Sequence, residues 1–493
     1  MKNRILTVSF ALLSAQLFSQ TIIENNINAN TTWSQDGNPY IVNQTITVSN
    51  NITLSIEPGV IIKLNGTGKL FIVNGSINAS GTSENPIIIT HITDDEYGGD
   101  SNGDGSQTAA KINSWASIQI NETSENSSHL NHCVFRFGGR VQGVVYADNC
   151  SPAINNCLFQ YCENGIEING FGSPSVKNNQ FKNIENYPVA ITPGVIPQFE
   201  GNTFSDNILT GLGLKKNTHT TDGDSLILSK TSIGGIKNAT YIVQTPIAID
   251  ENTSLTIHPG IVIKKYYNNN LFQVNGSLIA EGIAEEPIVF TFITDDEFGG
   301  DTNNDANNTI PKKDSWASIQ INETSANSSH LNHCVFRYGG RTNGSIYVQN
   351  SSPKIQNCYF KLCKNGLKIV NGNQLNISNL DFTDSETAIQ LQNESEFVNI
   401  EKSKFSNNLL ALEVISGLAK VDSCFFYKNE NAIKVMGGNA IIHHSEFVEN
   451  SKYHILNYTD KGIDATKNQW DENTIQELIS SSNLTNVKQL YDH

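Results

Sequence analysis

The chain is poor in positive charge and lacks the short motifs that mark many enzymes. Its 32 Lys and Arg residues stand against 48 Asp and Glu, which gives a formal net charge of −16. This surplus argues against nucleic acid or an anionic membrane surface as a partner. It suits a soluble extracellular protein or one that binds cations. We find no nucleophile elbow, phosphate loop, dinucleotide fingerprint or zinc-protease histidine pair. The sequence therefore contains no direct sign of a reaction.

Long hydrophobic runs are also scarce. The one near the N-terminus covers Ile5 to Leu13, follows the basic residues Lys2 and Arg4, and gives way to small and polar residues by Ser19. This order predicts a secretory signal peptide over residues 1–19, because the apolar run is too short to span a membrane. No later stretch is long and apolar enough for a membrane span. We therefore expect a secreted protein, extracellular or on the outer cell surface.

What the sequence does contain is a regular series of phenylalanines. The segment His129–Arg140 returns almost unchanged as His330–Arg341, and each copy starts such a series. The members are Phe135, Phe159, Phe181 and Phe204, then Phe336, Phe360, Phe382 and Phe405. The steps are 24, 22 and 23 residues in both copies (159 − 135, 181 − 159, 204 − 181). A fixed step of this size predicts a solenoid with one coil per step.

The residues around each phenylalanine indicate strands. In Cys157–Tyr161 the residues Cys157, Phe159 and Tyr161 share one face, because side chains alternate along a strand. A second short strand follows about five residues later, after pairs such as Asn164-Gly165 that tolerate a left-handed corner. Strand, corner, strand and loop in each coil predict an all-β parallel β-helix in which the aromatic rings stack inside.

The body of the chain is duplicated. Residues 40–204 match residues 241–405 at a constant offset of 201 (241 − 40 and 405 − 204). We therefore divide the chain into a signal peptide (1–19), a first unit with an acidic insertion (20–233), a second unit (234–434), and final coils with a cap (435–493). Apolar residues at helical spacing from Thr474 to Ile479, with Asn473 as N-cap, predict a short capping helix over the open end.

Eight cysteines raise the question of disulfides in a secreted protein. Cys133 and Cys157 occupy equivalent places in neighbouring coils, and so do Cys334 and Cys358. We favour buried free thiols that fill small inward positions. The strand spacing also permits a bridge between such neighbours. No Cys-x-x-Cys pair occurs, so zinc or redox use has little support.

An acidic insertion interrupts each unit and is the best candidate for a metal site. Oxygen ligands at alternate positions followed by a glycine, as in Asp100-x-Asn102-x-Asp104-Gly105, are typical of the start of a calcium loop. In the second copy Ala306 replaces the glycine, so we expect weaker binding there. The alternative is a solvated acidic loop. The candidate calcium ligands are Asp94, Asp95, Asp100, Asn102 and Asp104, then Asp295, Asp296, Asp301, Asn303 and Asp305.

Basic side chains form the second candidate site. The residue after each ladder phenylalanine is polar, which predicts that this face of the strand is exposed. Arg136 and Lys182 fall in one outward column, and Arg337 and Lys361 in its copy. Such residues could bind a polysaccharide or a cell-surface glycan, whereas the alternative is a solvated polar stripe. We expect the nearby histidines, such as His132, to end a strand rather than to bind metal.

Several of these segments carry a family resemblance. They are the openings Leu54–Lys63 and Leu255–Lys264, the acidic loops, and Trp316–Gly340. In them the chain resembles secreted right-handed parallel β-helix repeat proteins of Bacteroidota-type bacteria, which have the pectate-lyase-like fold. The resemblance implies the fold over nearly all of the mature chain. It leaves function open, because this fold serves lyases, hydrolases, epimerases, adhesins and passive surface proteins.

Two hypotheses of function follow. The first is a non-catalytic, calcium-binding surface protein that binds carbohydrate or mediates adhesion, with two similar faces for a repetitive ligand. The second is a polysaccharide lyase or another enzyme that degrades uronic-acid polysaccharides, with Arg136, Arg337 or a lysine as base. The sequence favours the first, because we find no acid–base constellation that only one unit possesses.

Overall fold

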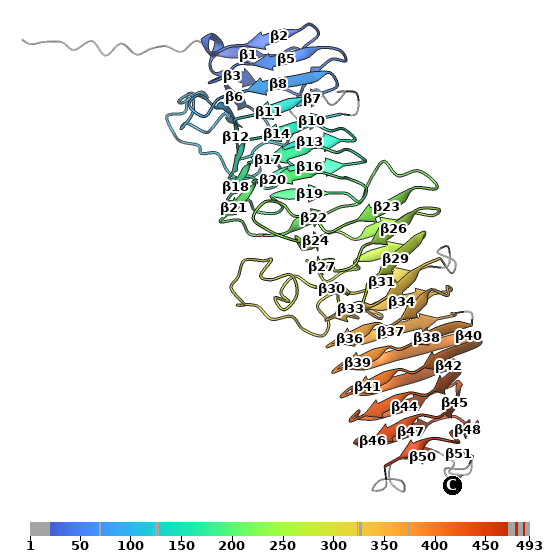
Figure 1. Ribbon diagram of the computed structural model, residues 1–493. Coiled ribbons are helices and arrows are strands. Elements are labelled where there is room, and N and C mark those ends of the chain that lie inside the picture. The colour runs from blue at the N-terminus through green and yellow to red at the C-terminus, as the bar shows by residue number, and fades with distance from the viewer. Residues whose placement is uncertain are drawn as a thin grey trace, which may run out of the picture.

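The computed structural model describes residues 20–493 except 69–70, 122, 124–127, 323, 325–327, 373, 472–478, 482–486 and 489–493. Figure 1 shows a long stack of short strands, with the N-terminal coils at one end and the C-terminal coils at the other. Every pair of neighbouring strands that we describe below is parallel. The signal peptide predicted over residues 1–19 lies outside the described residues. No helix within them is long and apolar enough to cross a membrane.

The first unit has three sheets, each with one strand per coil, and we name them A, B and C. The only named helix in the described part is η1 (Gln35–Gly37), before the first complete coil. Sheet A contains β1 (Thr21–Ile23), β3 (Tyr40–Val42), β6 (Ile61–Leu64), β9 (Ile87–His91), β12 (Cys133–Arg136), β15 (Leu158–Gln160), β18 (Gln180–Lys182) and β21 (Thr203–Ser205). Sheet C contains β2 (Thr31–Trp33), β5 (Thr53–Ile56), β8 (Ser76–Ser80), β11 (His129–Asn131), β14 (Ala153–Asn155), β17 (Ser175–Lys177) and β20 (Gln198–Glu200).

Sheet B runs through both units. Its first-unit strands are β4 (Ile46–Val48), β7 (Phe71–Val73), β10 (Ile118–Ile120), β13 (Val145–Asp148), β16 (Ile166–Asn169), β19 (Val189–Ile191) and β22 (Leu212–Leu214). Its strands in the second unit and the final coils are β24 (Tyr241–Val243), β27 (Val262–Lys265), β30 (Ile288–Phe292), β33 (Cys334–Arg337), β36 (Tyr359–Lys361), β39 (Asp381–Thr383), β41 (Lys404–Ser406), β43 (Phe425–Tyr427), β46 (Glu446–Val448) and β49 (Gln469–Trp470).

The phenylalanine ladder predicted from the repeat is confirmed. Phe135 stacks on Phe159 with ring centroids 4.9 Å apart, and Phe159 stacks on Phe181 at 5.0 Å. All three rings are fully buried. The second ladder runs from Phe290 to Trp470 through consecutive rungs. Stacked rings add about 0.5–1.5 kcal/mol per pair beyond the area that they bury.

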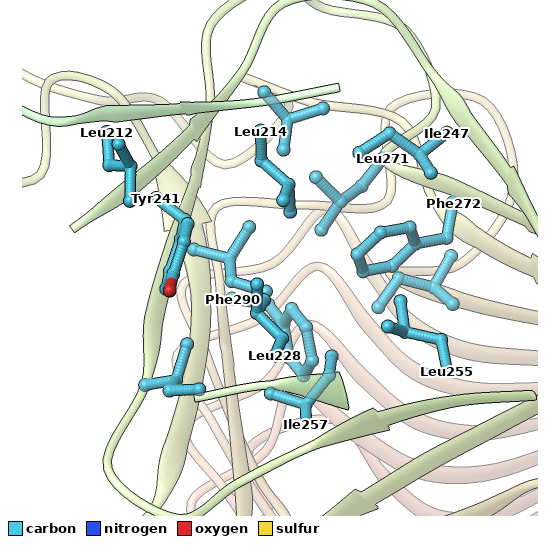
Figure 2. Packing of buried hydrophobic residues seen from close by; sticks show 14 of the residues in the cluster. Leu212, Leu214, Leu228, Tyr241, Ile247, Leu255, Ile257, Leu271, Phe272 and Phe290 are labelled. Atoms are coloured by element: carbon cyan, nitrogen blue, oxygen red, sulfur yellow. The ribbon is translucent and has the colours of Figure 1, made fainter. Parts of the chain in front are cut away.

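The two units are joined by a lateral step, visible in Figure 1 near β22 and β24. In the first unit the ladder lies in sheet A, which ends at β21. In the second unit the ladder strands continue sheet B instead, because β22 pairs with β24. The second unit is therefore displaced by one face of the solenoid. Figure 2 shows the core at this junction, where Leu212 and Leu214 lie with Tyr241 and Phe290 in one apolar cluster.

In the second half of the chain, the two remaining faces of the coils form a single large sheet, D. It begins at β23 (Ser225–Leu228) and ends at β51 (Val487–Lys488), and its long strands β40 (Thr387–Glu401) and β42 (Leu410–Asp422) span two faces of the coil. The helix predicted from Thr474 to Ile479 falls almost entirely outside the described residues. Ile479 itself begins β50 (Ile479–Ser481), which pairs with β47 (Tyr453–Asn457). A capping helix is therefore not confirmed.

The corners lie on either side of the ladder strands. Asn156 precedes β15 and Tyr161 follows it, with φ of 55° and 56°. His132, between β11 and β12, has φ of 49°, so this histidine marks a corner as expected. Gly165 does not have a positive φ, contrary to our expectation for Asn164-Gly165. It is needed for a different reason, since a Cβ there would lie 2.3 Å from the Pro188 oxygen.

All eight cysteines are buried free thiols in the structure, as the sequence favoured. Cys157 Sγ lies 3.5 Å from the backbone oxygen of Leu130 in the preceding coil. Burial raises the pKa of the Cys162 thiol to about 12. These thiols therefore act as small packing groups and weak donors.

Candidate functional site

A buried arginine ties the first acidic insertion to the solenoid. Arg136, on β12, is only 5% exposed. Its Nη1 lies 3.4 Å from Asp94 Oδ2, and its Nη2 lies 2.6 Å from Glu96 Oε2. The guanidinium also lies over the Tyr97 ring, 5.0 Å from its centroid. Asp94 accepts a further hydrogen bond from Thr90 Oγ1 at 2.6 Å.

The second insertion repeats this arrangement. Arg337 is 3% exposed, and it pairs with Asp295 at 3.2 Å and with Glu297 at 2.5 Å. The exposed position that we predicted for Arg136 and Arg337 is therefore wrong. The reason is that the insertion folds back over the outer face of the ladder strands, so the arginines neutralise its carboxylates. This placement gives no support to either arginine as a substrate-binding group or a base.

The predicted lysines lie in the same columns but remain more accessible. Arg136 is in register with Gln160, which is in register with Lys182. Arg337 is in register with Lys361. Lys182 is exposed and Lys361 is half-buried. The column exists as predicted, but the insertion covers the end of it that holds the arginine.

In the second insertion three carboxylates converge. Oxygen atoms of Asp296, Asp301 and Asp305 all lie within 4.8 Å of one another. Buried side-chain oxygens of Asp296 and Asn303 have no hydrogen-bond partner. Burial raises the pKa of the Asp296 carboxyl, opposed by the charge of Lys264 and reinforced by Asp301 and Asp305. Crowded carboxylates with unpaired oxygens match the oxygen ligands that calcium prefers.

The first insertion has the same turn but a looser cluster. Asp100 accepts hydrogen bonds from the backbone N–H groups of Asp104 (3.1 Å) and Gly105 (2.8 Å), and Asn102 donates to Asp104 at 2.8 Å. Asp95 also has a buried oxygen without a partner. Within the described residues, however, no such trio of carboxylates forms in this insertion. Asp94 and Asp295 form ion pairs with Arg136 and Arg337 instead.

Ala306 keeps the left-handed backbone of the glycine that it replaces. Its φ is 53°, compared with 62° for Gly105. Asp301 accepts hydrogen bonds from the N–H groups of Asp305 and Ala306, at 3.1 Å and 2.8 Å, just as in the first insertion. The substitution therefore leaves the turn intact. Which insertion binds a cation more tightly stays a prediction.

A polar groove that the sequence did not reveal lies on the outer face of sheet B in the first unit. Its volume is about 450 Å³. Strands β13 and β16 supply its upper wall, and the segment 215–218 that follows β22 supplies the other side. Its lining is Val141, Gln142, Tyr146, Glu163, Asn164, Glu167, Asn169, Asn186, Tyr187, Lys215, Lys216, Thr218, Gln244 and Thr245. The last two residues belong to the second unit, so the lateral step closes the lower end of the groove.

A hydrogen-bonded network fixes the upper wall of the groove. Tyr146 donates to Asp148 Oδ1 at 3.1 Å, and Asn169 Nδ2 donates to the same oxygen at 2.8 Å. His219 Nε2 lies 2.8 Å from that oxygen, and Thr218 Oγ1 accepts from Asn169 Nδ2 at 2.6 Å. Burial, with the nearby charges of Asp148 and Glu167, raises the pKa of Tyr146, so its hydroxyl stays protonated. The network therefore holds the side chains of Tyr146 and Asn169 against the Asp148 carboxylate at the wall of the groove.

The carboxylates of the groove have two different surroundings. Glu167 is paired with Lys215 at 2.6 Å and accepts the Gly143 N–H at 3.1 Å. Glu163 has no ion pair within 4 Å among the described residues, and it accepts a hydrogen bond from Asn186 Nδ2 at 3.3 Å. Burial raises the pKa of Glu163, although its hydrogen bond to Asn113 and the charges of Arg140 and Lys215 act in the opposite direction.

The duplicated unit replaces several of the side chains that line this groove. At the offset of 201, Glu163 corresponds to Lys364, Glu167 to Lys368, Asp148 to Gln349 and Asn169 to Val370, whereas Tyr146 corresponds to another tyrosine, Tyr347. The first unit alone therefore has this set of side chains. A comparison of the two copies was the one sequence signal that could have located the site.

A second, more apolar cavity of about 640 Å³ lies on the opposite side of the junction, between the end of sheet C and the start of sheet D. Phe171, Ile196 and Ile227 contribute exposed side chains to it. Its polar groups are few, and His258 Nδ1 lies 3.1 Å from Ser229 Oγ.

Comparisons with known proteins agree on the fold. A model described as "Right handed beta helix region" matches residues 297–475, and one described as "Pectate-lyase like beta helix domain" matches residues 25–142. No curated protein matches the chain significantly. Similar solved structures include the catalytic domain of GH87 alpha-1,3-glucanase with tetrasaccharides (TM-score 0.26) and with nigerose (TM-score 0.24). Both are 10% identical, and each match covers 84% of this chain and 68% of that chain. These TM-scores are too low to carry an argument about function.

Proposed function

We propose that this right-handed parallel β-helix repeat protein is a secreted carbohydrate-binding protein whose ligand lies in the groove of the first unit. The observation that carries the proposal is the lining of that groove. Amides, hydroxyls and a tyrosine ring converge there on one concave surface, and the duplicated unit keeps the tyrosine but has other residues in place of Glu163, Glu167 and Asn169. Concave sites with a few fixed polar groups are the usual form of ligand sites.

The chemistry of the lining suits a sugar. Each sugar hydroxyl both donates and accepts a hydrogen bond, and so do side-chain amides and protein hydroxyls. Gln142 and Gln244 face the groove from the two units, and Tyr146, which is 7% exposed, contributes the accessible part of its ring and a protonated hydroxyl. The network behind Tyr146 holds the ring without any change of conformation on binding, which lowers the entropic cost of association.

Calcium forms the second part of the proposal. We assign it to Asp296, Asp301 and Asp305, because their oxygens converge and one oxygen of Asp296 has no partner. The chemistry that calcium supplies is neutralisation and ordering of the insertion. The same insertion bonds to the first unit, since Thr210 N donates to the Thr302 oxygen at 3.0 Å. A cation there therefore supports the junction that closes the groove.

A glycan array followed by calorimetry tests the binding function. We expect the wild-type protein to bind at least one glycan. The variant Tyr146→Ala removes the ring from the groove, whereas Tyr347→Ala removes the corresponding ring from the second unit. Loss of binding in the first variant alone supports the groove. Equal binding by both variants and the wild type would show that the ligand lies elsewhere.

Calcium is tested by thermal unfolding with and without EDTA. We expect added calcium to raise the unfolding temperature, and Asp301→Asn to remove most of that rise. The matched variant Asp100→Asn changes the equivalent residue of the first insertion. It shows how much of the calcium-dependent rise in unfolding temperature comes from that insertion. No effect of calcium on the wild-type protein would eliminate the metal from the proposal.

A further inference from the structure

We infer that the groove selects an electrically neutral saccharide and rejects uronic-acid chains. This inference rests on the proposed function and concerns the class of its ligand. The observation is the charge state of the lining: every cation that lines the groove is already paired with a carboxylate. An acidic polysaccharide is held by charge-assisted hydrogen bonds between protein cations and the sugar carboxylates. Cations that are already paired are not free to form these bonds.

The pairing is direct for both lysines of the lining. Lys215 Nζ lies 2.6 Å from Glu167 Oε2, and the Glu167 side chain is only 9% exposed. Lys216 Nζ lies 2.8 Å from Asp250 Oδ2. A uronate that used Lys215 would have to displace Glu167 and leave that buried carboxylate without its partner. Such a loss is among the more expensive changes at a protein surface.

The other charges around the groove point in the same direction. Glu163 lines the groove and has no ion pair within 4 Å in the part of the chain that the structure describes, and Asp148 lies behind the groove with three polar partners. His219 contacts Asp148 and is therefore also occupied. Arg140 is close enough to act on Glu163 but does not line the groove. A carboxylate on the ligand would meet net repulsion or neutrality, and no free positive charge among the lining residues.

The second unit has the opposite charge at two of the corresponding positions. Its corresponding surface carries Lys364 and Lys368 in place of Glu163 and Glu167. Two positions that hold carboxylates in the first unit therefore hold cations in the second, so an anionic ligand would meet repulsion from these positions only in the first unit. Specificity often comes from such a repulsive element as well as from attractive contacts.

The test compares neutral oligosaccharides with oligogalacturonate and oligoglucuronate of similar length, by calorimetry at about 50 mM and about 500 mM sodium chloride. We expect a neutral oligosaccharide to bind, with a dissociation constant that changes by less than about twofold between the two salt concentrations. The uronates should bind at least about tenfold more weakly. Tight, salt-sensitive binding of a uronate would overturn the inference and leave carbohydrate binding in place. Binding of no saccharide at all would overturn the proposed function.

A charge variant gives a second readout. Glu167→Gln leaves Lys215 without its charge partner in the groove, so affinity for the uronates should rise relative to affinity for the neutral ligand. The matched control is Glu413→Gln, which frees Lys434 from a comparable pair at 3.1 Å in the second unit. It should leave both affinities unchanged. No gain for uronates in folded Glu167→Gln protein, checked by circular dichroism, would contradict the inference.

Discussion

Leu212 lies directly beside Tyr241 in a parallel sheet, and this pairing joins the two halves of the molecule. Both residues belong to sheet B. In the first unit this sheet does not contain the phenylalanine ladder, whereas in the second unit it does. The duplicated units are thus displaced sideways instead of stacked face on face. The displacement brings Gln244 and Thr245 under the outer face of the first unit, where they complete the groove.

Gly213 makes the close packing at this step possible. A Cβ at this position would lie 2.7 Å from the Tyr187 ring and 2.8 Å from the Ala190 Cβ. We predict that Gly213→Ala destabilises the protein by about 1–3 kcal/mol through overpacking. Gly235→Ala is the control, because nothing lies within 4 Å of the added group. Urea unfolding measures both, and equal stability of the two variants would contradict this view of the junction.

The ladder should be most sensitive to truncation in its buried middle. Phe360 is fully buried between Phe336 and Phe382, at centroid distances of 4.8 Å and 4.5 Å. We predict that Phe360→Ala costs about 3–5 kcal/mol. Phe204 is the last rung of the first ladder and is only half-buried, so Phe204→Ala should cost clearly less. Chemical denaturation of both variants measures these losses, and the prediction is that Phe360→Ala loses more stability than Phe204→Ala.

Removal of the buried arginine should release the insertion. Arg337→Met leaves Asp295, which is 3% exposed, without its charge partner. We predict a loss of about 3–5 kcal/mol, as when one member of a buried ion pair is deleted. Arg341 is a suitable control, since its pair with Asp314 is exposed and 4.0 Å long. Thermal unfolding and proteolysis within residues 293–318 report the result. An Arg337→Met protein as stable and as protease-resistant as Arg341→Met would contradict the role of Arg337 in holding the insertion against the solenoid.

Lys265 predicts a pH dependence of stability. It is fully buried and donates to the backbone oxygen of Val243, and burial lowers its pKa from 10.5 to about 7. Between pH 7 and 10.5 the unfolded chain therefore binds a proton that the folded protein does not. Stability consequently rises with pH in this window. The first unit has Leu64 at the corresponding position.

The variant Lys265→Leu removes this cost. We predict that it is more stable than the wild type at pH 7 by roughly 1–4 kcal/mol. The difference should shrink as the pH rises toward 10, because Lys265 releases its proton on folding and that release costs less free energy at higher pH. Urea unfolding at several pH values gives both curves. A difference that stays constant from pH 7 to pH 10 would mean that another group is responsible.

The fold could be predicted from the sequence because each coil of the solenoid uses a nearly constant number of residues. Phe135 and Phe159 must lie one coil apart, so a constant step between aromatic residues is a direct record of the stacking. The lateral step could not be predicted in the same way. The repeat weakens between Phe204 and Tyr241, and the choice of which sheet Leu212 joins depends on packing in three dimensions.

The candidate sites were predicted only in part. The carboxylates that converge in the second insertion were among the residues named from the sequence, because oxygen spacing within a short loop is local; their binding of calcium stays a prediction. The burial of Arg136 was missed, because it depends on an insertion that folds back from residues 94–96. The groove was missed for a similar reason. Lys215 meets Glu167 and His219 meets Asp148 across separations of 48 and 71 residues, and no motif records such contacts.

A crystal structure of the protein grown with calcium and a neutral oligosaccharide tests the central claim most directly. We predict that the sugar lies over Tyr146, between Glu163 and Gln244, with no sugar on the corresponding surface around Tyr347. Electron density for the sugar on the second unit, or on the exposed lysines of the ladder column, would contradict the account.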